Sequence, residues 1–183
     1  GSGGQAVVPG DWDLMSSGSY LNNCATPAGL TGLERQIANW AQPIELTTTA
    51  NGLYLPAIND SSVFYKIDLG NDNEFLMLEH RRKTRWDAYI PGEGMLIYHA
   101  QQNRLDRWLE NQWNDINVTP NNRGWYIVPA TGNNGHTETS NAPFPGTSGN
   151  SNFTNVTTPA NTLMNGTPTN KPITSIQYQN DTV

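Results

Sequence analysis

The chain has few charges, almost no cysteine or histidine, and no long hydrophobic run. Of its 183 residues, 14% are charged, one is cysteine and three are histidine. The formal net charge of −6 argues against a nucleic-acid partner, because nucleic-acid binding needs a wide basic face. No apolar run approaches the ~20 residues that a membrane-spanning helix needs. We therefore expect neither a nucleic-acid partner nor a membrane span.

The motifs that mark common catalytic sites are also missing. A zinc hydrolase motif H-E-x-x-H places two histidines one helical turn apart. His80, His99 and His136 are too far apart in sequence to form it. The calcium-loop pattern, the G-x-S-x-G nucleophile turn, the phosphate-binding loop and the dinucleotide fingerprint are absent as well. The chain by itself contains no complete catalytic constellation, and we assign no metal ligands to it.

Two isolated reactive residues have two interpretations each. Cys24 would be unremarkable in a cytosolic protein, whereas in a secreted protein an odd cysteine suggests a partner elsewhere. His99 follows the apolar stretch "MLIY". It is either a neutral histidine hydrogen-bonded to the backbone or to a carboxylate, or a secondary metal ligand.

The stretch "FLMLEHRRKTRWDAY" combines a mostly apolar strand with charged residues. A buried unpaired carboxylate is costly, so we expect Glu79 to pair with a nearby cation. Asp87 is expected to accept a hydrogen bond in the following turn. The candidate partners of Glu79 are Arg81, Arg82 and Arg85. Together with Lys83 they form a cluster of cations that is interpreted as a solvated strand end.

One helix is predicted near the start, at about residues 31–42. Thr31 and Glu34 have the spacing of a capping box, and Pro43 is expected to end the helix. The residues expected on its apolar face are Leu33, Ile37, Trp40 and Ala41. A second short helix is predicted at about 104–112.

Strands are predicted from runs of apolar residues that are bounded by polar turns. In residues 74–80, Leu76 and Leu78 alternate with Phe75 and Met77, and the nearly continuous apolarity predicts a strand covered on both faces. The other predicted strands are "LYLPAI", "SVFYKIDL", "MLIYHA", "GWYIVPA" and "ITSIQY". Only three charged residues follow residue 130, which favours long loops packed over the body.

These elements predict a single α+β unit over residues 1–183, with mostly antiparallel β-structure. The helix at about residues 31–42 is near the N-terminus, and the C-terminal third is expected to consist of long loops.

Several unusual segments occur in the same order as in one family. "GDWDLMSSGSY" and "TPAGLTGLERQIANWAQPIEL" resemble the immune inhibitor A family of secreted bacterial zinc metallopeptidases. "FLMLEHRRKTRWDAYIPGEGMLIYHAQ", "GWYIVPATG" and "PFPG" match further segments, so the resemblance covers residues 8–178. Two departures are Ala38-Asn39, where Leu-Gly is common, and His80, where asparagine is usual.

The resemblance implies a metzincin-like zinc endopeptidase that acts on peptide or protein substrates outside the cell. In the family, H-E-x-x-H and a third, acidic ligand lie just N-terminal to the W-D-L-M turn. This chain would then be the C-terminal subdomain of the catalytic domain, with residues 1–30 as the methionine-turn segment and cleft wall and residues 31–183 as the helix and β-rich body. Zinc would bind to the missing N-terminal half, and the chain alone would be inactive.

The resemblance also implies roles for the turn residues. Met15 would be the methionine that passes beneath the zinc, and Trp12 and Leu14 would anchor the turn, so that these three form the active-site floor. The primed side of the cleft would be lined by Ser16, Ser17, Gly18, Ser19 and Tyr20. Tyr20 could also stabilise the oxyanion, although packing at the surface or in the core is the other interpretation.

Two alternatives remain. The six Trp and seven Tyr would also suit a secreted β-rich module that binds carbohydrate or protein. A degenerate family member that kept the fold and lost the zinc ligands would have the same sequence in this region.

Overall fold

A five-stranded sheet forms the centre of the computed structural model, which describes residues 8–71, 73–111, 115–120, 122–132 and 140–178. The strands follow one another across the sheet in chain order. β1 pairs with β2 in parallel, and the remaining pairs are antiparallel. Their bounds are β1 Ile44–Glu45, β2 Tyr65–Asp68, β3 Glu74–Arg81, β4 Gly94–Gln101 and β5 Trp125–Val128. The fold is therefore α+β and mostly antiparallel, as predicted.

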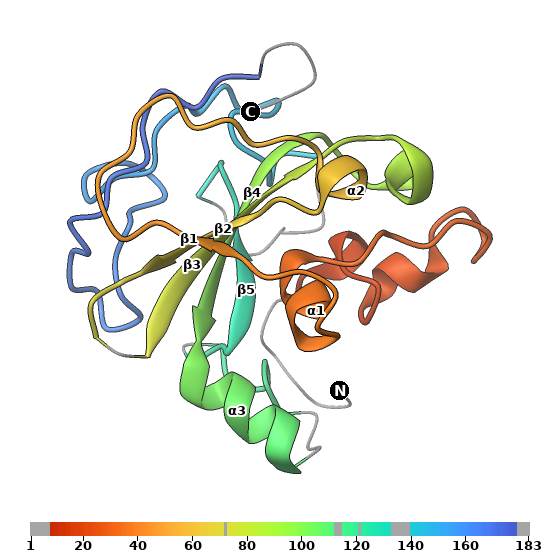
Figure 1. Cartoon of the computed structure of the whole chain (residues 1–183), viewed down its shortest axis with the longest axis horizontal. Helices are drawn as coiled ribbons and strands as arrows, with labels where there is room; N and C mark the ends of the chain where they lie inside the picture. The colour runs from red at the N-terminus through yellow and green to blue at the C-terminus, as the bar shows by residue number, and fades with distance from the viewer. Residues whose placement is uncertain (1–7, 72, 112–114, 121, 133–139, 179–183) are drawn as a thin grey trace.

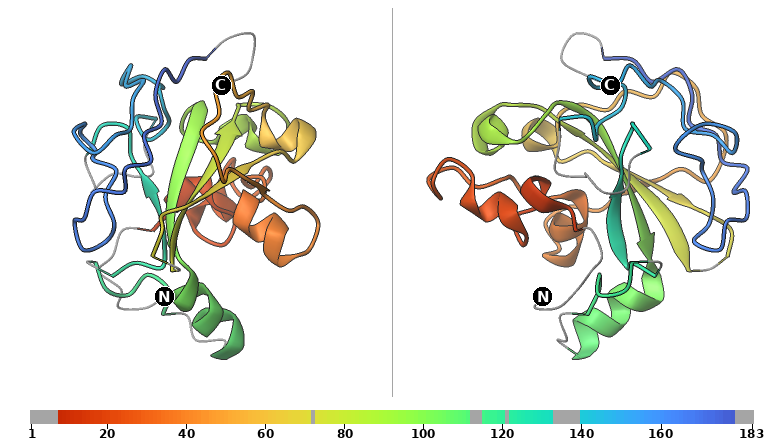
Figure 2. Two further views of the ribbon diagram at one scale, coloured as in Figure 1. Left: turned by 60° about the vertical axis from the view of Figure 1, so that its left-hand side comes forward. Right: turned by 180° about the vertical axis from the view of Figure 1, so that it is seen from behind.

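The two faces of the sheet are covered by opposite ends of the chain. The N-terminal segment, with its short helices, lies on one side, and the long C-terminal loops lie on the other (Figures 1 and 2). Alternate residues of β3 point to each side: Phe75 and Met77 belong to the core under the N-terminal layer, whereas Leu76 and Leu78 belong to the core under the loops. Side chains alternate between the two faces of any strand, so one strand supplies both cores.

β3 and β4 are buried along their whole length. They pair with each other from Glu74–Gln101 to Arg81–Gly94. This confirms the prediction of a strand covered on both faces. It also means that the charged residues of β3 are buried between two layers, where they need partners.

Helix α1 covers only Gly32–Ile37, which is shorter than the predicted 31–42. The predicted capping box of Thr31 and Glu34 is present. The helix ends at Ile37 with Ala38 as its C-cap, and the next residue, Asn39, takes a left-handed conformation with φ of 57°. The amide of Trp40 donates to Arg35 O and the amide of Asn39 donates to Gln36 O, which is the Schellman motif. Pro43 is not the residue that stops the helix.

The early end of α1 changes which residues face the core. Leu33 is buried, and Ala41 packs partly against the same core. Ile37 and Trp40 are 41% and 74% exposed. The prediction that these two side chains face the core is wrong. Ile37 is the last residue of the helix and is turned toward solvent, and Trp40 lies beyond Asn39, where the chain leaves the helical path.

The second predicted helix is confirmed as α3, Gln102–Asn111. A further one-turn helix, α2, spans Ile58–Ser61. The prediction of a strand at "LYLPAI" is therefore wrong, since only residues 56–57 form isolated bridges. The predicted strand "ITSIQY" is also wrong, since only Ile173 pairs, with Phe153. Three short 3-10 helices complete the described elements: η1 Gly10–Trp12, η2 Ser17–Tyr20 and η3 Arg85–Tyr89.

The C-terminal loops are held by apolar side chains and asparagine side chains rather than by strands. Phe144 and Phe153 are buried against the sheet. Asn161 donates to Lys171 O, and Asn150 donates to Ala130 O. Among the described residues, no helix has the length and apolarity that crossing a membrane requires.

Candidate functional site

The turn that contains Met15 is shaped by one aspartate. Asp13 Oδ1 accepts a hydrogen bond of 2.7 Å from the Met15 amide. The Asp13 carbonyl accepts from the amides of Ser16 and Gly18 at 3.0 and 3.2 Å. Ser17 Oγ adds a bond of 2.7 Å to Asp11. The backbone around Met15 is therefore fixed by local hydrogen bonds, although it lies between two 3-10 helices rather than in a long element.

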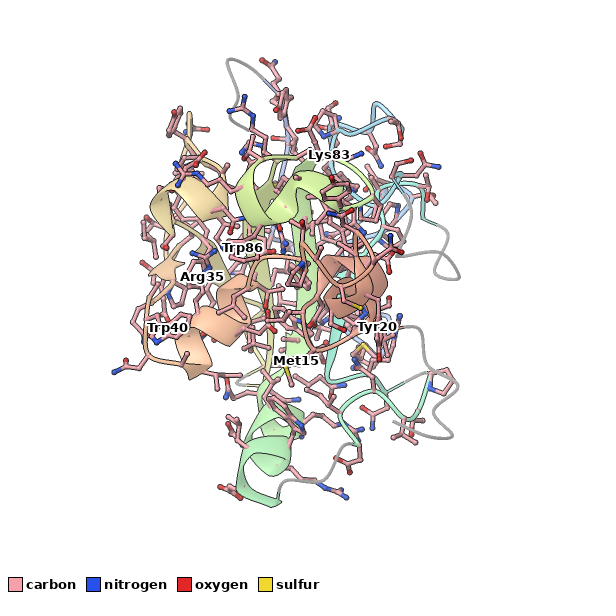
Figure 3. The ribbon with its side chains drawn as sticks, turned by 90° about the vertical axis from the view of Figure 1, so that its right-hand side faces the viewer. Met15, Tyr20, Arg35, Trp40, Lys83 and Trp86 are labelled. Carbon is pink, nitrogen blue, oxygen red and sulfur yellow. The ribbon has the colours of Figure 1, made fainter. Side chains whose placement is uncertain are left out.

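The proposed floor residues lie in different environments. Trp12 is fully buried in the core beneath the N-terminal layer, and Leu14 is half-buried. The Met15 side chain is 77% exposed. Figure 3, seen from the side of the N-terminal layer, labels Met15 on that side of the molecule. The tryptophan thus anchors the turn, and the methionine is presented to the outside.

The residues predicted to line the primed side of a cleft follow directly. Ser16, Ser17 and Ser19 are half-buried and Gly18 is buried. Tyr20 is 71% exposed and lies on the same outer side as Met15 (Figure 3). A hollow of about 380 Å³ occurs elsewhere on the surface, between Lys83, Pro145 and Tyr178, and no turn residue lines it.

A buried ion cluster lies beneath this turn. Arg81 is fully buried and pairs with Glu79 at 3.0 Å and with Asp87 at 2.6 Å. Burial alone would lower the pKa of Arg81, but the charges of Asp87 and Glu79 outweigh it and raise that pKa well above the ordinary value. The guanidinium is therefore charged at every accessible pH. The predicted pairing of Glu79 with a nearby cation is confirmed, whereas the predicted solvation of Arg81 is wrong.

The ion cluster connects the sheet to the N-terminal layer. Arg81 donates to the carbonyls of Trp12 and Gly29 at 3.1 and 3.0 Å. Asp87 accepts from the Gly29 amide at 2.8 Å, and Glu79 accepts from the Gly32 amide at 2.6 Å. Asp87 is an acceptor, as predicted, but for a distant loop rather than for its own turn. The contacts of Arg81 with Trp12 and Gly29 have no signal in the sequence.

For two carboxyl groups next to the cluster, nearby charges and hydrogen bonds do not outweigh burial. Burial raises the pKa of Asp13, and the hydrogen bond from Met15 acts in the opposite direction. Burial and the nearby charge of Asp13 raise the pKa of Glu34 to about 7. Glu34 Oε2 accepts from the Thr31 amide at 2.7 Å, while its buried Oε1 has no hydrogen-bond partner among the described residues. Glu34 is therefore partly protonated at neutral pH.

Replacing Glu34 with glutamine is expected to remove a pH dependence of stability. The pKa of Glu34 is about 7 in the folded chain against 4.5 for the unperturbed group. Below pH 4.5 both states hold the proton. From there to pH 7 the folded state alone keeps it, so stability falls as pH rises, by as much as about 3 kcal/mol.

Urea denaturation at pH 5 and pH 8 gives the change in the free energy of unfolding between the two pH values. The effect is the difference in this change between wild type and Glu34→Gln. The glutamine oxygen can still accept from Thr31, so the helix cap is kept. Glu45→Gln is the control, because the Glu45 side chain is 61% exposed. An equal pH dependence in wild type and Glu34→Gln would contradict the assignment.

His99 is part of a separate buried network on the opposite face of the sheet. Its Nε2 lies 2.7 Å from Glu74 Oε2, and its Nδ1 lies 2.9 Å from the Tyr126 hydroxyl. Glu74 also accepts from the Met164 amide at 2.8 Å. The interpretation of His99 as a histidine satisfied by a carboxylate is confirmed, and the network fastens a C-terminal loop to β3 and β4.

Cys24 is exposed and unpaired within the described residues. No group of three or more His, Cys, Asp and Glu side chains that could hold a metal ion occurs in the described part of the chain. Comparison with family models, curated proteins and solved structures finds no match.

Proposed function

We propose that this chain is the C-terminal part of the catalytic domain of a secreted zinc metalloendopeptidase similar to immune inhibitor A. The order of the segments "GDWDLMSSGSY", "FLMLEHRRKTRWDAY" and "PFPG" supports this family. The observation that carries the proposal is the contrast within the turn, in which Trp12 is 0% exposed and Met15 is 77% exposed. An apolar side chain held outward on a hydrogen-bonded backbone is suited to contact another part of the protein.

The chemistry of this turn fits a supporting role in a zinc site. A thioether is apolar, flexible and only weakly polar at sulfur, so Met15 can pack beneath imidazole ligands without competing for the metal. The ligands H-E-x-x-H and the general base would come from the half of the polypeptide upstream of this chain. When bound there, zinc would supply an activated water as the nucleophile for peptide hydrolysis.

The residues of this chain would then bind and position rather than react. Met15 would support the ligands from below, and the segment 16–20 would contact the substrate residues that follow the scissile bond. The Tyr20 hydroxyl, on an exposed side chain, would be available to the oxyanion. Secretion of the whole protein is part of the same proposal.

The 183-residue chain by itself is expected to hydrolyse no peptide and to bind no zinc at micromolar concentration. A zymogram, a quenched-fluorescent peptide assay and zinc titration by calorimetry measure this directly. The matched experiment uses the polypeptide together with the sequence encoded upstream, with the glutamate of the expected H-E-x-x-H replaced by alanine as its control. Chelator-sensitive hydrolysis by the longer protein, lost in that variant, is the expected result. Metal-dependent turnover by the 183 residues alone would contradict it.

An upstream sequence without H-E-x-x-H would instead favour the degenerate family member. The binding module has a separate observation in its favour, since Trp40 and Trp86 are 74% and 60% exposed and lie on the same outer side of the molecule (Figure 3). A glycan array probed with wild type and with the double variant Trp40→Ala, Trp86→Ala distinguishes the binding module from the peptidase. Binding that requires both tryptophans would support the module.

A further inference from the structure

One buried side chain holds both ends of the loop that contains Met15. This loop, residues 13–28, begins after Trp12 and ends before Gly29. The two carbonyls at these ends accept hydrogen bonds from Arg81, one from Nη1 at 3.1 Å and one from Nη2 at 3.0 Å. Arg81 is the last residue of β3, the central strand of the sheet, so both ends of the loop are fixed to the end of that strand.

The loop is also closed upon itself, so its two ends determine its shape. The Ala28 amide donates to Gly18 O at 2.9 Å, and the Gly18 amide donates to Asp13 O at 3.2 Å. A Cβ at Gly18 would lie 2.6 Å from Asp13 O and 2.9 Å from Ala28 Cβ. The loop thus has no free space at Gly18, where the backbone of Asp13 and the side chain of Ala28 meet, and we expect a shift at either end to move the whole loop. Compact loops with close ends are often functional.

Only an arginine has the donors for this arrangement. Nε donates to Asp87 Oδ2 at 2.7 Å, Nη2 also donates to Asp87 Oδ1 at 2.6 Å, and Nη1 also donates to Glu79 at 3.0 Å. With the two carbonyls these are five hydrogen bonds, which equals the number of N–H groups in a guanidinium. A lysine has three donors and cannot adopt this planar geometry.

We propose that Arg81 is a positioning residue that fixes the loop 13–28 and thereby sets where Met15 and Tyr20 are presented. Its effect on catalysis rests on the proposed function, in which these two side chains lie at the zinc site. The fixation of the loop does not depend on that function. Glu79 and Asp87 compensate the buried positive charge of the guanidinium, and its remaining N–H groups bind the uncharged carbonyls of Trp12 and Gly29 within the core.

Amide hydrogen exchange of Arg81→Lys tests the fixation. Relative to wild type, exchange at the amides of Met15, Gly18 and Ala28 is expected to accelerate at least tenfold more than exchange within β3. Phe153→Leu is the matched control, because Phe153 is buried on the opposite face of the sheet. In Phe153→Leu, amide exchange in the loop and in β3 is expected to accelerate to the same degree. Equal acceleration of loop and strand in Arg81→Lys would overturn the proposal.

Wild-type protein gives a second test that does not require a folded variant. In low denaturant, the three loop amides are expected to exchange through one shared opening, with the same denaturant slope. Independent openings would overturn the proposal, because a single group at both ends requires the loop to open as a unit.

The catalytic consequence is measured in the longer protein that includes the upstream half. Arg81→Lys is expected to lower kcat about tenfold and to change KM less than about twofold, since the displaced groups support the metal site rather than bind most of the substrate. If Arg81→Lys showed accelerated loop exchange but an unchanged kcat, the proposed effect of Arg81 on catalysis would be overturned. If wild type shows no metal-dependent hydrolysis, the proposed function fails, and the exchange experiment still decides whether Arg81 fixes the loop.

Discussion

Replacing Glu79 with leucine is expected to lower the free energy of unfolding by about 3–5 kcal/mol, the cost of removing one partner from a buried ion pair. Glu79 is 0% exposed. It accepts from Arg81 at 3.0 Å, from the Gly32 amide at 2.6 Å and from the Tyr98 hydroxyl at 3.1 Å. Leucine would leave two donors without an acceptor and Arg81 with one carboxylate instead of two. Urea denaturation of the purified chain measures the loss.

The control for this substitution is Glu45→Leu. Glu45 pairs with Lys66 at 3.3 Å, but its side chain is 61% exposed, and exposed ion pairs contribute about 0–1 kcal/mol. For a chain of this size, the loss expected for Glu79→Leu corresponds to a fall in the melting temperature of about 10 °C. Similar losses in the two variants would show that the buried cluster does not hold the N-terminal layer on the sheet.

The central strands could be predicted because their signal is local. Alternation of Leu76 and Leu78 with Phe75 and Met77 assigns each side chain to a face, and both cores contain the expected residues. The capping box of Thr31 and Glu34 could be found for the same reason, since its two partners are three residues apart in sequence. Burial of β3 then required a partner for Glu79, which narrowed the candidates to the nearby cations.

The end of α1 was predictable in principle from one residue. Asparagine tolerates the left-handed conformation better than most residues, and Asn39 adopts it. The apolar period of Ile37 and Trp40 suggested a longer helix, and the local cap decided the outcome.

The arrangement around the candidate site could not be derived from the sequence. Arg81 is 69 residues from Trp12 and 52 residues from Gly29 along the chain, and its acceptors are carbonyls, which every residue has. Only the path of the chain over the sheet brings them together. The positions of the C-terminal loops could not be predicted either, because turns and asparagine side chains hold them and no periodic pattern marks where they pack. The apolar residues around Ile173, for example, suggested a strand, but Ile173 forms only an isolated bridge with Phe153.

The second large effect concerns activity rather than stability. If the proposed function holds, Met15→Ser in a longer protein that includes the proposed zinc ligands is expected to lower kcat/KM about 10–100-fold. It is expected to weaken zinc binding by a similar factor, as loss of a residue that supports metal ligands does. The serine side chain is polar and short, so it would leave a gap under the ligands. The melting temperature of the 183-residue chain should change by less than about 2 °C, because Met15 is 77% exposed there and makes little contact within the chain.

This combination separates a site residue from an ordinary surface residue. Val156→Ser is the matched control, since Val156 is 93% exposed on a C-terminal loop and is expected to change neither quantity. Asp13→Asn gives an intermediate case, because the amide oxygen can still accept from Met15 while the carboxylate charge is lost. If Met15→Ser left both kcat/KM and zinc affinity unchanged, the turn would have no part in the metal site. A large fall in the stability of the isolated chain would instead show that Met15 packs within it.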